Sequence, residues 1–285
     1  MKYINIMIKK LLKSLGPVKW ILNFRREFAL IRFETIRQTR IQQAILKELL
    51  MQNNNDENPL LKYEHQTFSQ NGEDGIINEI FNRLGITKGE FIEIGTGDGS
   101  ENNTRLLLEL GWKGTWIDGN PNCLNSIYNE LAHFISSKKL NAQLNFVDSD
   151  NINSILKNNN ISPDVDLLSL DLDLTTHLVW EALTYITPKV LVIEYNGFFP
   201  KNTLWQANIK GNESWDGSIN MGASLSTIIK ISEVKNYKLI GTELSGTNAF
   251  FVHQSIQHYF TDFIDVANHQ PARPYIVNGP AHVRD

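Results

Sequence analysis

The sequence predicts an α/β fold in which a doubly wound parallel sheet follows an N-terminal helical arm and ends in an antiparallel hairpin. Three observations predict this fold class. A buried strand runs into a glycine-rich turn over residues 91–100. Strand-like and helix-like apolar patterns then alternate, as they do in βαβ units. Finally, two strand patterns over 237–241 and 248–252 flank Ser245-Gly246, which is a hairpin signal.

Length and composition bound the number of domains. With 285 residues and 41% hydrophobic content, the chain can form one large α/β domain with an appendage. We expect a basic helical arm and linker over residues 1–60, the main domain over 61–265 and an irregular tail over 266–285. Cys123 is the single cysteine, which excludes an internal disulfide and a zinc-binding cysteine cluster. Because no signal-peptide pattern is present either, we expect a cytoplasmic protein.

The charge of the chain is unevenly distributed. Residues 1–50 contain eleven Lys or Arg and three Glu, so they carry +8, and the remainder carries −12. Such a basic arm can make a peripheral contact with an anionic membrane, although these charges are more often a solvated helix face. Phe24, Phe28 and Ile31 begin an apolar stripe that predicts one long helix over 24–50, with a homodimer contact as a further expectation. We expect neither a membrane span nor a nucleic-acid partner.

Apolar periodicity predicts the elements of the main domain. Strands are predicted over 91–94, 115–118, 142–147, 165–170, 190–193, 237–241 and 248–252. Helices are predicted over 76–84, 106–110, 121–136 and 222–234, the last with Ile228 and Val234 facing inward. The segment 197–220 has no clear period, so we expect a long loop over the site. Its aromatic residues either stack on a flat substrate face or pin the loop to the core.

The glycine turn after the first strand indicates a nucleotide-cofactor site. Its spacing is G-x-G-x-G, and each glycine lacks a Cβ where a ligand would approach the backbone. Ser100 stands where a dinucleotide fingerprint would have a third glycine, and it is predicted to cap a helix whose N–H groups face the ligand. Acids in the strand and the turn suit a cationic ligand. The candidate cofactor residues here are Glu93, Gly95, Gly97, Asp98 and Gly99.

Two further strand ends supply candidate cofactor contacts. Asp118 ends the second strand, where an acid can accept hydrogen bonds from both ribose hydroxyls. The alternative is a turn residue beside Gly119. Asp148 and Ser149 follow the third strand and, from position alone, can reach an adenine amino group.

Candidate catalytic residues follow the fourth and fifth strands. Asp171, Glu194 and Asn196 stand at the carboxyl ends of adjacent predicted strands. They can orient a hydroxyl for deprotonation or share a divalent cation, and the alternative is that they cap loops. We expect no obligatory metal ion. His177 is a further candidate proton acceptor, although a lone histidine is more often a helix-surface residue.

The ordered motifs of the chain also resemble those of a known family. They cover roughly residues 68–254 and are Ser69–Asp74, Glu93–Thr104, Gly111–Gly114, Ser169–Asp173, Ile193–Asn196, Gly222–Leu225 and Asn248–Phe251. Together they resemble the FkbM-like group of class I methyltransferases that depend on S-adenosyl-L-methionine (SAM). The resemblance implies a Rossmann-like class I methyltransferase sheet, SAM as cofactor, and O-methylation of a sugar hydroxyl in a glycan or glycolipid precursor. Leu174 and Thr176 depart from the Gly and Asp typical of related sequences.

Two alternative functions stay open. The first is an NAD-dependent oxidoreductase on a Rossmann sheet, against which Ser100 and the terminal hairpin argue. The second is a non-catalytic SAM-binding scaffold that holds a partner through its basic arm. The departures at Leu174 and Thr176 keep the second alternative open.

Overall fold

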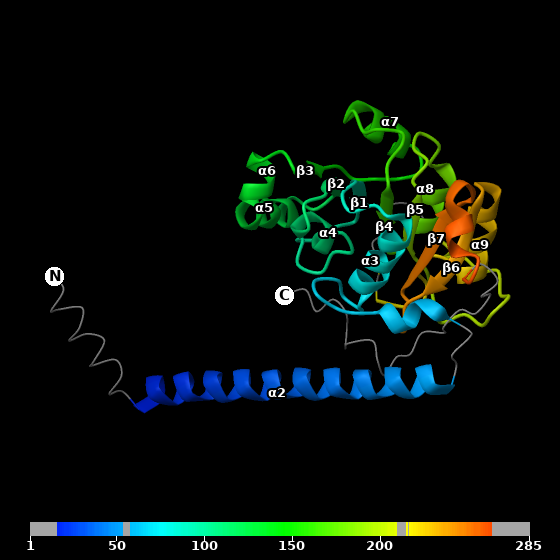
Figure 1. The fold of residues 1–285 in the computed structure, drawn as a ribbon. Coiled ribbons are helices and arrows are strands. Elements are labelled where there is room, and N and C mark those ends of the chain that lie inside the picture. Colours follow the sequence, from blue (N-terminus) through cyan, green and yellow to red (C-terminus); the bar gives the residue numbers. More distant parts are fainter. Residues whose placement is uncertain (1–15, 54–57, 210–214, 216, 264–285) are drawn as a thin grey trace. The chain divides into compact units, whose positions relative to one another are not determined.

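The computed structural model describes residues 16–53, 58–209, 215 and 217–263. The chain divides into two compact units, Met1–Asn53 and Asn54–Asp285. The first contains the long helix and the second contains the sheet (Figure 1). The predicted tail over 266–285 lies outside the described residues, as do the first fifteen residues and most of the predicted linker.

The first unit is described as one helix, α2 (Gly16–Asn53), which is 38 residues long. This confirms the helix predicted over 24–50. Several of its large apolar side chains are exposed, among them Phe24, Phe28 and Ile31. The rings of Phe24 and Phe28 stack with their centroids 6.3 Å apart, as residues one helical turn apart can do. Within the described part of the chain, no helix has both the length and the apolar character needed to cross a membrane.

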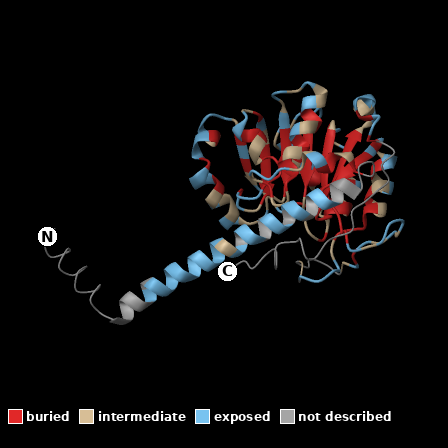
Figure 2. Cartoon of the chain, turned by 60° about the horizontal axis from the view of Figure 1, so that its bottom comes forward, coloured by how far each residue is buried: buried red, intermediate tan, exposed pale blue. Residues whose placement is uncertain are grey.

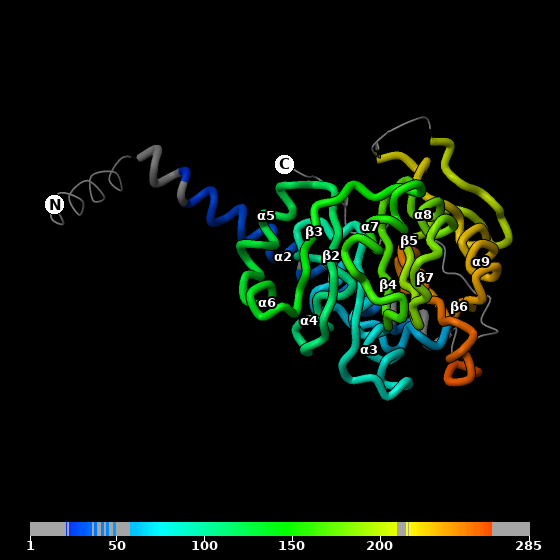
Figure 3. Tube along the Cα trace, turned by 90° about the horizontal axis from the view of Figure 1, so that it is seen from above, coloured from blue at the N-terminus to red at the C-terminus, as the bar shows by residue number. Residues whose placement is uncertain are grey.

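The second unit is built on a seven-stranded sheet in the order β3-β2-β1-β4-β5-β7-β6 (Figures 1 and 3). The strands are β1 (Glu90–Ile94), β2 (Lys113–Asp118), β3 (Leu140–Leu144), β4 (Leu167–Leu170), β5 (Val190–Glu194), β6 (Tyr237–Thr242) and β7 (Asn248–His253). The first five are parallel, whereas β7 runs antiparallel to both β5 and β6. The predicted doubly wound sheet with a terminal hairpin is therefore confirmed.

Helices cover both faces of this sheet. They are α3 (Glu73–Leu84), α4 (Arg105–Glu109), α5 (Pro121–Glu130), α6 (Ala132–Ser136), α7 (Ile152–Asn158), α8 (Thr176–Ala182) and α9 (Leu225–Val234), with two short 3₁₀ helices, η1 (Pro59–Tyr63) and η2 (Gln254–Phe260). One core cluster takes its helical side chains from α3 to α6, and the other from α7 to α9. Phe250 and Phe251 enter opposite clusters, so the strands are buried on both faces (Figure 2).

Two predicted boundaries and one predicted side-chain orientation are wrong. The third strand was predicted over 142–147, but β3 ends at Leu144 and a loop follows it. The helix predicted over 121–136 is divided into α5 and α6, because Leu131 between them leaves helical geometry at φ −111° and ψ 21°. Val234 is 82% exposed rather than inward, since it is the last residue of α9, whereas Ile228 is fully buried as predicted.

Candidate cofactor and acceptor site

The glycine turn after β1 has the conformation that only glycine adopts readily. Gly95, Gly97 and Gly99 all have positive φ, between 56° and 85°. A Cβ on Gly95 would stand 1.6 Å from the backbone oxygen of Asp171, so no side chain fits there. A Cβ on Gly97 would meet nothing within 4 Å. The turn therefore packs tightly against the end of β4 and leaves the Gly97 backbone open to a ligand.

The helix that follows this turn begins later than predicted. Ser100 does not cap a helix, because α4 starts only at Arg105 and has five residues. The Ser100 hydroxyl instead donates to Asp98 Oδ1 over 2.6 Å. Asp98 is exposed, and its carboxylate closes the turn locally. Among the described residues, the first helix after the glycine turn therefore begins at Arg105 rather than at Ser100.

Glu93 explains why the helix is delayed. Its buried carboxylate accepts hydrogen bonds from the backbone N–H groups of Asn103 at 2.9 Å and Thr104 at 3.1 Å, and from the Thr104 hydroxyl. These bonds hold the segment before α4 in an irregular conformation. Burial raises the pKa of Glu93, and the hydrogen bonds oppose that shift. Glu93, predicted to bind the cofactor, thus supports the loop beside the glycine turn.

Asp118 lies directly beside the glycine turn. Its Oδ2 accepts a hydrogen bond from the Gly97 N–H at 2.7 Å, and its Oδ1 accepts one from the Asn120 N–H at 2.7 Å. A carboxylate oxygen can accept more than one hydrogen bond, so both oxygens keep capacity for ligand hydroxyls. The structure thus joins Asp118 to the glycine turn and gives it the turn-stabilising role that was the alternative, and its contact with ribose hydroxyls stays a prediction.

Asp148 and Ser149 are placed differently from the other predicted cofactor residues. Asp148 Oδ1 accepts from the backbone N–H groups of Asp150 and Asn151, both at 2.9 Å, so it stabilises the turn into α7. Ser149 is exposed.

The sequence reasoning missed Phe146, which is 72% exposed and lies 3.3 Å from where a Cβ of Gly119 would stand. An exposed aromatic ring after the third strand was the available signal.

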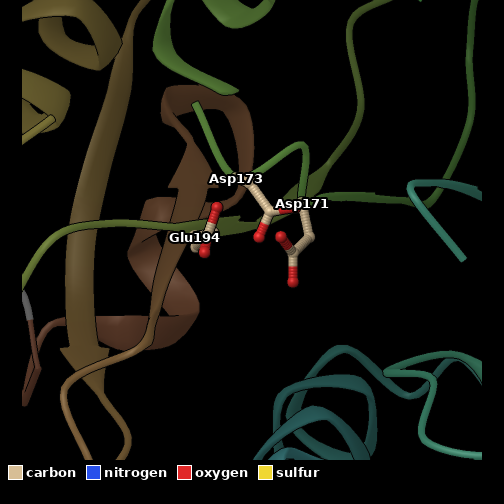
Figure 4. A group of neighbouring side chains, drawn as sticks. All are labelled: Asp171, Asp173 and Glu194. Atoms are coloured by element: carbon tan, nitrogen blue, oxygen red, sulfur yellow. The ribbon is translucent and has the colours of Figure 1, made fainter. Parts of the chain in front are cut away.

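A second group of acids gathers at the ends of β4 and β5. Asp171, Asp173 and Glu194 point toward one another (Figure 4), and a carboxylate oxygen from each lies within 4.8 Å of the others. We call these three residues the acid cluster. Asp173 was not among the predicted site residues, although the Asp-x-Asp spacing was visible in the sequence. Its left-handed backbone, with φ 52°, is part of the turn that brings it back toward Glu194.

Burial and mutual repulsion favour the protonated forms of Asp171 and Glu194 in the acid cluster. Burial, with the charge of Asp173 adding to it, raises the pKa of Asp171 to about 7. The pKa of Glu194 is raised well above its usual value, first by burial and then by the charges of Asp171 and Asp173. The Thr176 hydroxyl donates to Glu194 over 3.1 Å. Such a cluster can accept a proton from a ligand, or hold a hard divalent cation in place of its own proton.

Asn196 does not join the acid cluster through the hydrogen bonds of its side chain. Its amide donates to the backbone oxygens of Ile219 at 2.8 Å and Met221 at 3.0 Å, and its oxygen accepts from the Phe198 N–H at 3.1 Å. These three bonds use the two donors and one acceptor position of the amide. Asn196, predicted as catalytic, therefore connects the strand end to the loop over 197–220.

His177 is buried rather than on the helix surface. It is 1% exposed, and neither ring nitrogen has a hydrogen-bond partner among the described residues. Burial lowers the pKa of its imidazole to about 4, so it is neutral at pH 7. A base with this pKa would accept a hydroxyl proton much less readily than Asp171.

The loop over 197–220 is attached to the start of α9 through its backbone. The backbone N–H of Trp205 donates to the hydroxyls of Ser224 at 3.1 Å and Thr227 at 3.0 Å. Phe199 and Trp205 stack with their ring centroids 4.1 Å apart, and both lie within the loop. Whether the aromatic residues stack on a substrate or pin the loop to the core therefore stays open.

The Ser69–Asp74 motif has a structural role. Asp74 Oδ2 accepts hydrogen bonds from the backbone N–H groups of Thr67 at 2.8 Å, Phe68 at 2.6 Å and Ser69 at 2.7 Å. This arrangement fixes the loop before α3. The ring of Phe68 in turn lies 5.0 Å from the guanidinium of Arg105. The motif thus stabilises a loop that contacts the segment after the glycine turn.

The sheet order, with antiparallel β7 between β5 and β6, defines a Rossmann-like class I methyltransferase fold. Among solved structures, the chain is similar to the N-terminal domain of EvdMO1 with SAH bound, at 11% identity, covering 65% of this chain and 80% of that one, with a TM-score of 0.43. It is also similar to a TehB-like SAM-dependent methyltransferase from Corynebacterium glutamicum, at 11% identity, 74% and 99% coverage and a TM-score of 0.39.

A third similar structure is a SAM-dependent methyltransferase from Clostridium acetobutylicum, at 10% identity, 64% and 90% coverage and a TM-score of 0.38. No family model matches the chain, and no curated protein matches its sequence.

Proposed function

We propose that this protein is a SAM-dependent methyltransferase whose acceptor atom is an oxygen. The observation that carries the proposal is the arrangement at one edge of the sheet. The glycine turn and Asp118 lie at the carboxyl ends of β1 and β2, and the acid cluster lies at the ends of β4 and β5. In doubly wound sheets, ligands bind outside the carboxyl ends of the strands, at the point where the strand order reverses. In this sheet that point lies between β1 and β4.

The residues beside the glycine turn fit the parts of SAM. Asp118 has acceptor capacity for the ribose hydroxyls, and the open backbone face at Gly97 leaves room for the cofactor. Phe146 offers an exposed ring on which an adenine can stack. The nearby acids favour a sulfonium cation over an anionic dinucleotide. When bound, SAM supplies an electrophilic methyl group.

Asp171 is the residue we propose as the general base. Its pKa of about 7 lets it be ionised at neutral pH yet basic enough to accept a hydroxyl proton. Glu194 shares the hydrogen-bonded cluster and is held by Thr176, so it orients Asp171. SAM would supply the methyl group and leave as SAH, and the proton of the acceptor hydroxyl would pass to Asp171. A sugar hydroxyl of a glycan or glycolipid precursor is the acceptor we propose.

The oxidoreductase alternative is disfavoured by the segment after the glycine turn. A dinucleotide pyrophosphate is usually bound by the N–H groups of a helix that begins at this turn. Here α4 begins only at Arg105, and Glu93 accepts the N–H groups just before it. In addition, β7 is antiparallel, whereas the dinucleotide fold has parallel strands in the order 3-2-1-4-5-6.

Calorimetry on the full chain with SAM, SAH and NADH tests the cofactor assignment. We expect saturable binding of SAM and SAH and none of NADH. The scaffold alternative is then tested with radiolabelled SAM and a set of nucleotide sugars and glycolipids. Transfer of label to an acceptor supports an enzyme, whereas SAM binding without transfer to any of them favours the scaffold. Binding of NADH in place of SAM would overturn the proposal.

A further inference from the structure

The exposed surface of α2 contains a seven-residue repeat. With Ile21 as position a of a heptad, positions a and d are Ile21, Phe24, Phe28, Ile31, Thr35, Gln38, Gln42, Ile45 and Leu49. We call this set the α2 seam. All of its members are exposed, and its apolar members are each between 50% and 64% exposed. A seam of this kind is how one helix packs against another in a coiled coil.

The α2 seam differs from the rest of the helix in charge. Over residues 21–53, positions a and d are the only two heptad positions three residues apart at which no Lys, Arg, Asp or Glu occurs. Charged residues flank the seam instead, with Glu27, Glu34 and Glu48 at position g and Arg25 and Arg32 at position e. Two such seams can therefore meet without burying a charge.

The flanking charges match a second copy of the same helix in the parallel orientation. In a parallel pair, position g of one helix faces position e of the following heptad on the other. Glu27 would thus face the partner's Arg32, and the two-fold symmetry of the pair would form this contact twice. In an antiparallel pair with the seams fully overlapped, Glu27 would face the partner's Glu48, and these like charges would repel each other.

Three polar residues in the middle of the seam would fix the register of the two helices. They are Thr35, Gln38 and Gln42. In register, each Gln meets its own counterpart, and one amide can donate to the other and accept from it. A shift by one heptad would pack Gln38 against the partner's Ile31 or the partner's Ile45, where its buried amide would find no hydrogen bond. Polar residues in a coiled-coil seam set the register in this way at some cost in stability.

We propose that α2 pairs with α2 of a second copy of this chain as a parallel, two-stranded coiled coil in register. The seam is long enough, because Ile21 to Leu49 covers about four heptads, roughly 42 Å at 1.5 Å per residue. The second unit begins at Asn54, directly after α2. A parallel pair therefore attaches both sheet domains at the same end of the coiled coil. This assignment does not depend on the cofactor or on the acceptor.

Cysteine cross-linking of the full chain tests the orientation and the register. Cys123 is the single cysteine, so Cys123→Ser gives a background without thiols. Ile21→Cys and Leu49→Cys are introduced into it separately and oxidised. Both should form disulfide-linked dimers, because equal positions meet in a parallel pair in register. Arg26→Cys, at the outer position f, is the control and should stay unlinked.

The opposite orientation would give a different pattern of cross-links. Antiparallel helices would leave Ile21→Cys and Leu49→Cys chains unlinked by themselves. They would instead link a mixture of Phe24→Cys and Leu49→Cys chains, because a position near one end of the seam then meets a position near the other end. That outcome would overturn the parallel assignment.

Two phenylalanines provide a matched test of the seam itself. Phe28 is 61% exposed and lies in the seam, whereas Phe33 is 66% exposed and lies at position f. In sedimentation equilibrium, Phe28→Glu should raise the dissociation constant of the dimer at least about tenfold, because it places two like charges in the seam. Phe33→Glu should leave that constant unchanged. Near-UV circular dichroism checks that the sheet domain is folded in both variants, and an equal effect of the two substitutions would overturn the proposal.

The oligomeric state of the unaltered full chain decides the remaining alternatives. A chain that stays monomeric at every concentration would overturn the proposal. Vesicles of equal parts phosphatidylcholine and phosphatidylserine are then added to it, and binding that is lost in Phe28→Glu but kept in Phe33→Glu would assign the seam to an anionic membrane surface. A dimer that Phe28→Glu leaves intact would show that the copies meet elsewhere, which would also overturn the proposal.

Discussion

The two halves of the sheet edge use their carboxylates in opposite ways. At the ends of β1 and β2, Glu93 and Asp118 each accept hydrogen bonds from backbone N–H groups, which fix the glycine turn and the segment after it. At the ends of β4 and β5, three carboxylates mainly face one another, and the pKa of Asp171 is raised to about 7. In the first half the carboxylates hold the backbone in place, and in the second half they raise one another's pKa. The comparison predicts that changes in the two halves will affect binding and turnover separately.

The largest effect should come from the acid cluster. Once an acceptor is found, Asp171→Asn or Glu194→Gln should lower kcat by at least about a hundredfold, the usual scale for a lost general base or its orienting carboxylate. SAM affinity should change little in either variant. Asp164→Asn, at an exposed position before β4, is the matched control. Full activity in Asp171→Asn would remove this residue from the mechanism.

A smaller effect is expected at the ends of β1 and β2. Asp118→Ala should weaken SAM binding by about 1.5 to 3 kcal/mol, the scale of hydrogen bonds to a charged acceptor. Calorimetry measures the loss, and thermal unfolding without SAM measures how much comes from the bond to Gly97. Asp118→Asn keeps an acceptor and should lose less. Unchanged SAM affinity in both variants would refute the ribose assignment.

Two truncations compare the arm with the sheet domain. Removing residues 1–53 should leave SAM affinity and thermal stability unchanged, because the cofactor residues lie in the second unit. Removing 1–60 should cost about 2 kcal/mol of stability, since Leu60 is fully buried. It also deletes Asn58, which donates to the Thr242 oxygen over 2.7 Å. Equal stability of the two truncated proteins would contradict a boundary between residues 53 and 54.

The shorter truncation also tests the partner of the arm. We propose that α2 associates with a second copy of itself through its exposed apolar residues, such as Phe28 and Ile45. Sedimentation at several concentrations should then show a dimer that becomes a monomer without residues 1–53. Binding to anionic vesicles by a monomeric full chain would instead favour the membrane contact.

A change of pH should alter kcat by a smaller factor than the substitutions in the acid cluster, because it changes the ionisation of Asp171. A base must be ionised to act, so kcat should rise about tenfold between pH 6 and pH 8 for a pKa of about 7. The raised pKa of Asp171 makes the stability of the folded state fall as the pH rises, whereas kcat rises. The folded state binds the proton more tightly than the unfolded state, so this contribution is full below about pH 4 and is lost as the pH rises through about 7. Asp171→Asn should flatten both profiles.

The smallest effect is expected from metal removal. We propose that the acid cluster works with its own protons, so turnover should survive EDTA. Activity that is abolished by EDTA and restored by magnesium would instead make Asp171, Asp173 and Glu194 metal ligands, which their 4.8 Å grouping permits.

The order of elements in the sheet domain and the glycine turn could be predicted from the sequence. Near-continuous apolar runs over 165–170 and 190–193 predicted strands buried on two faces, because only helices on both sides of a sheet require that pattern. Ser245-Gly246 between two strand patterns predicted the hairpin that β6 and β7 form. The glycine spacing after β1 predicted a turn without side chains, and positive φ at each glycine confirms it. Each of these signals lies within one short segment of the chain, so it can be recognised from the sequence.

Only the tertiary structure decided which polar groups meet. The delay of α4 to Arg105 depends on Glu93, whose carboxylate takes N–H groups about ten residues further along the chain. Asp173, rather than Asn196, joins Asp171 and Glu194, because a left-handed turn carries it toward β5. The physical reason is that hydrogen-bond partners and burial come from segments that the fold brings together, and no local pattern specifies them.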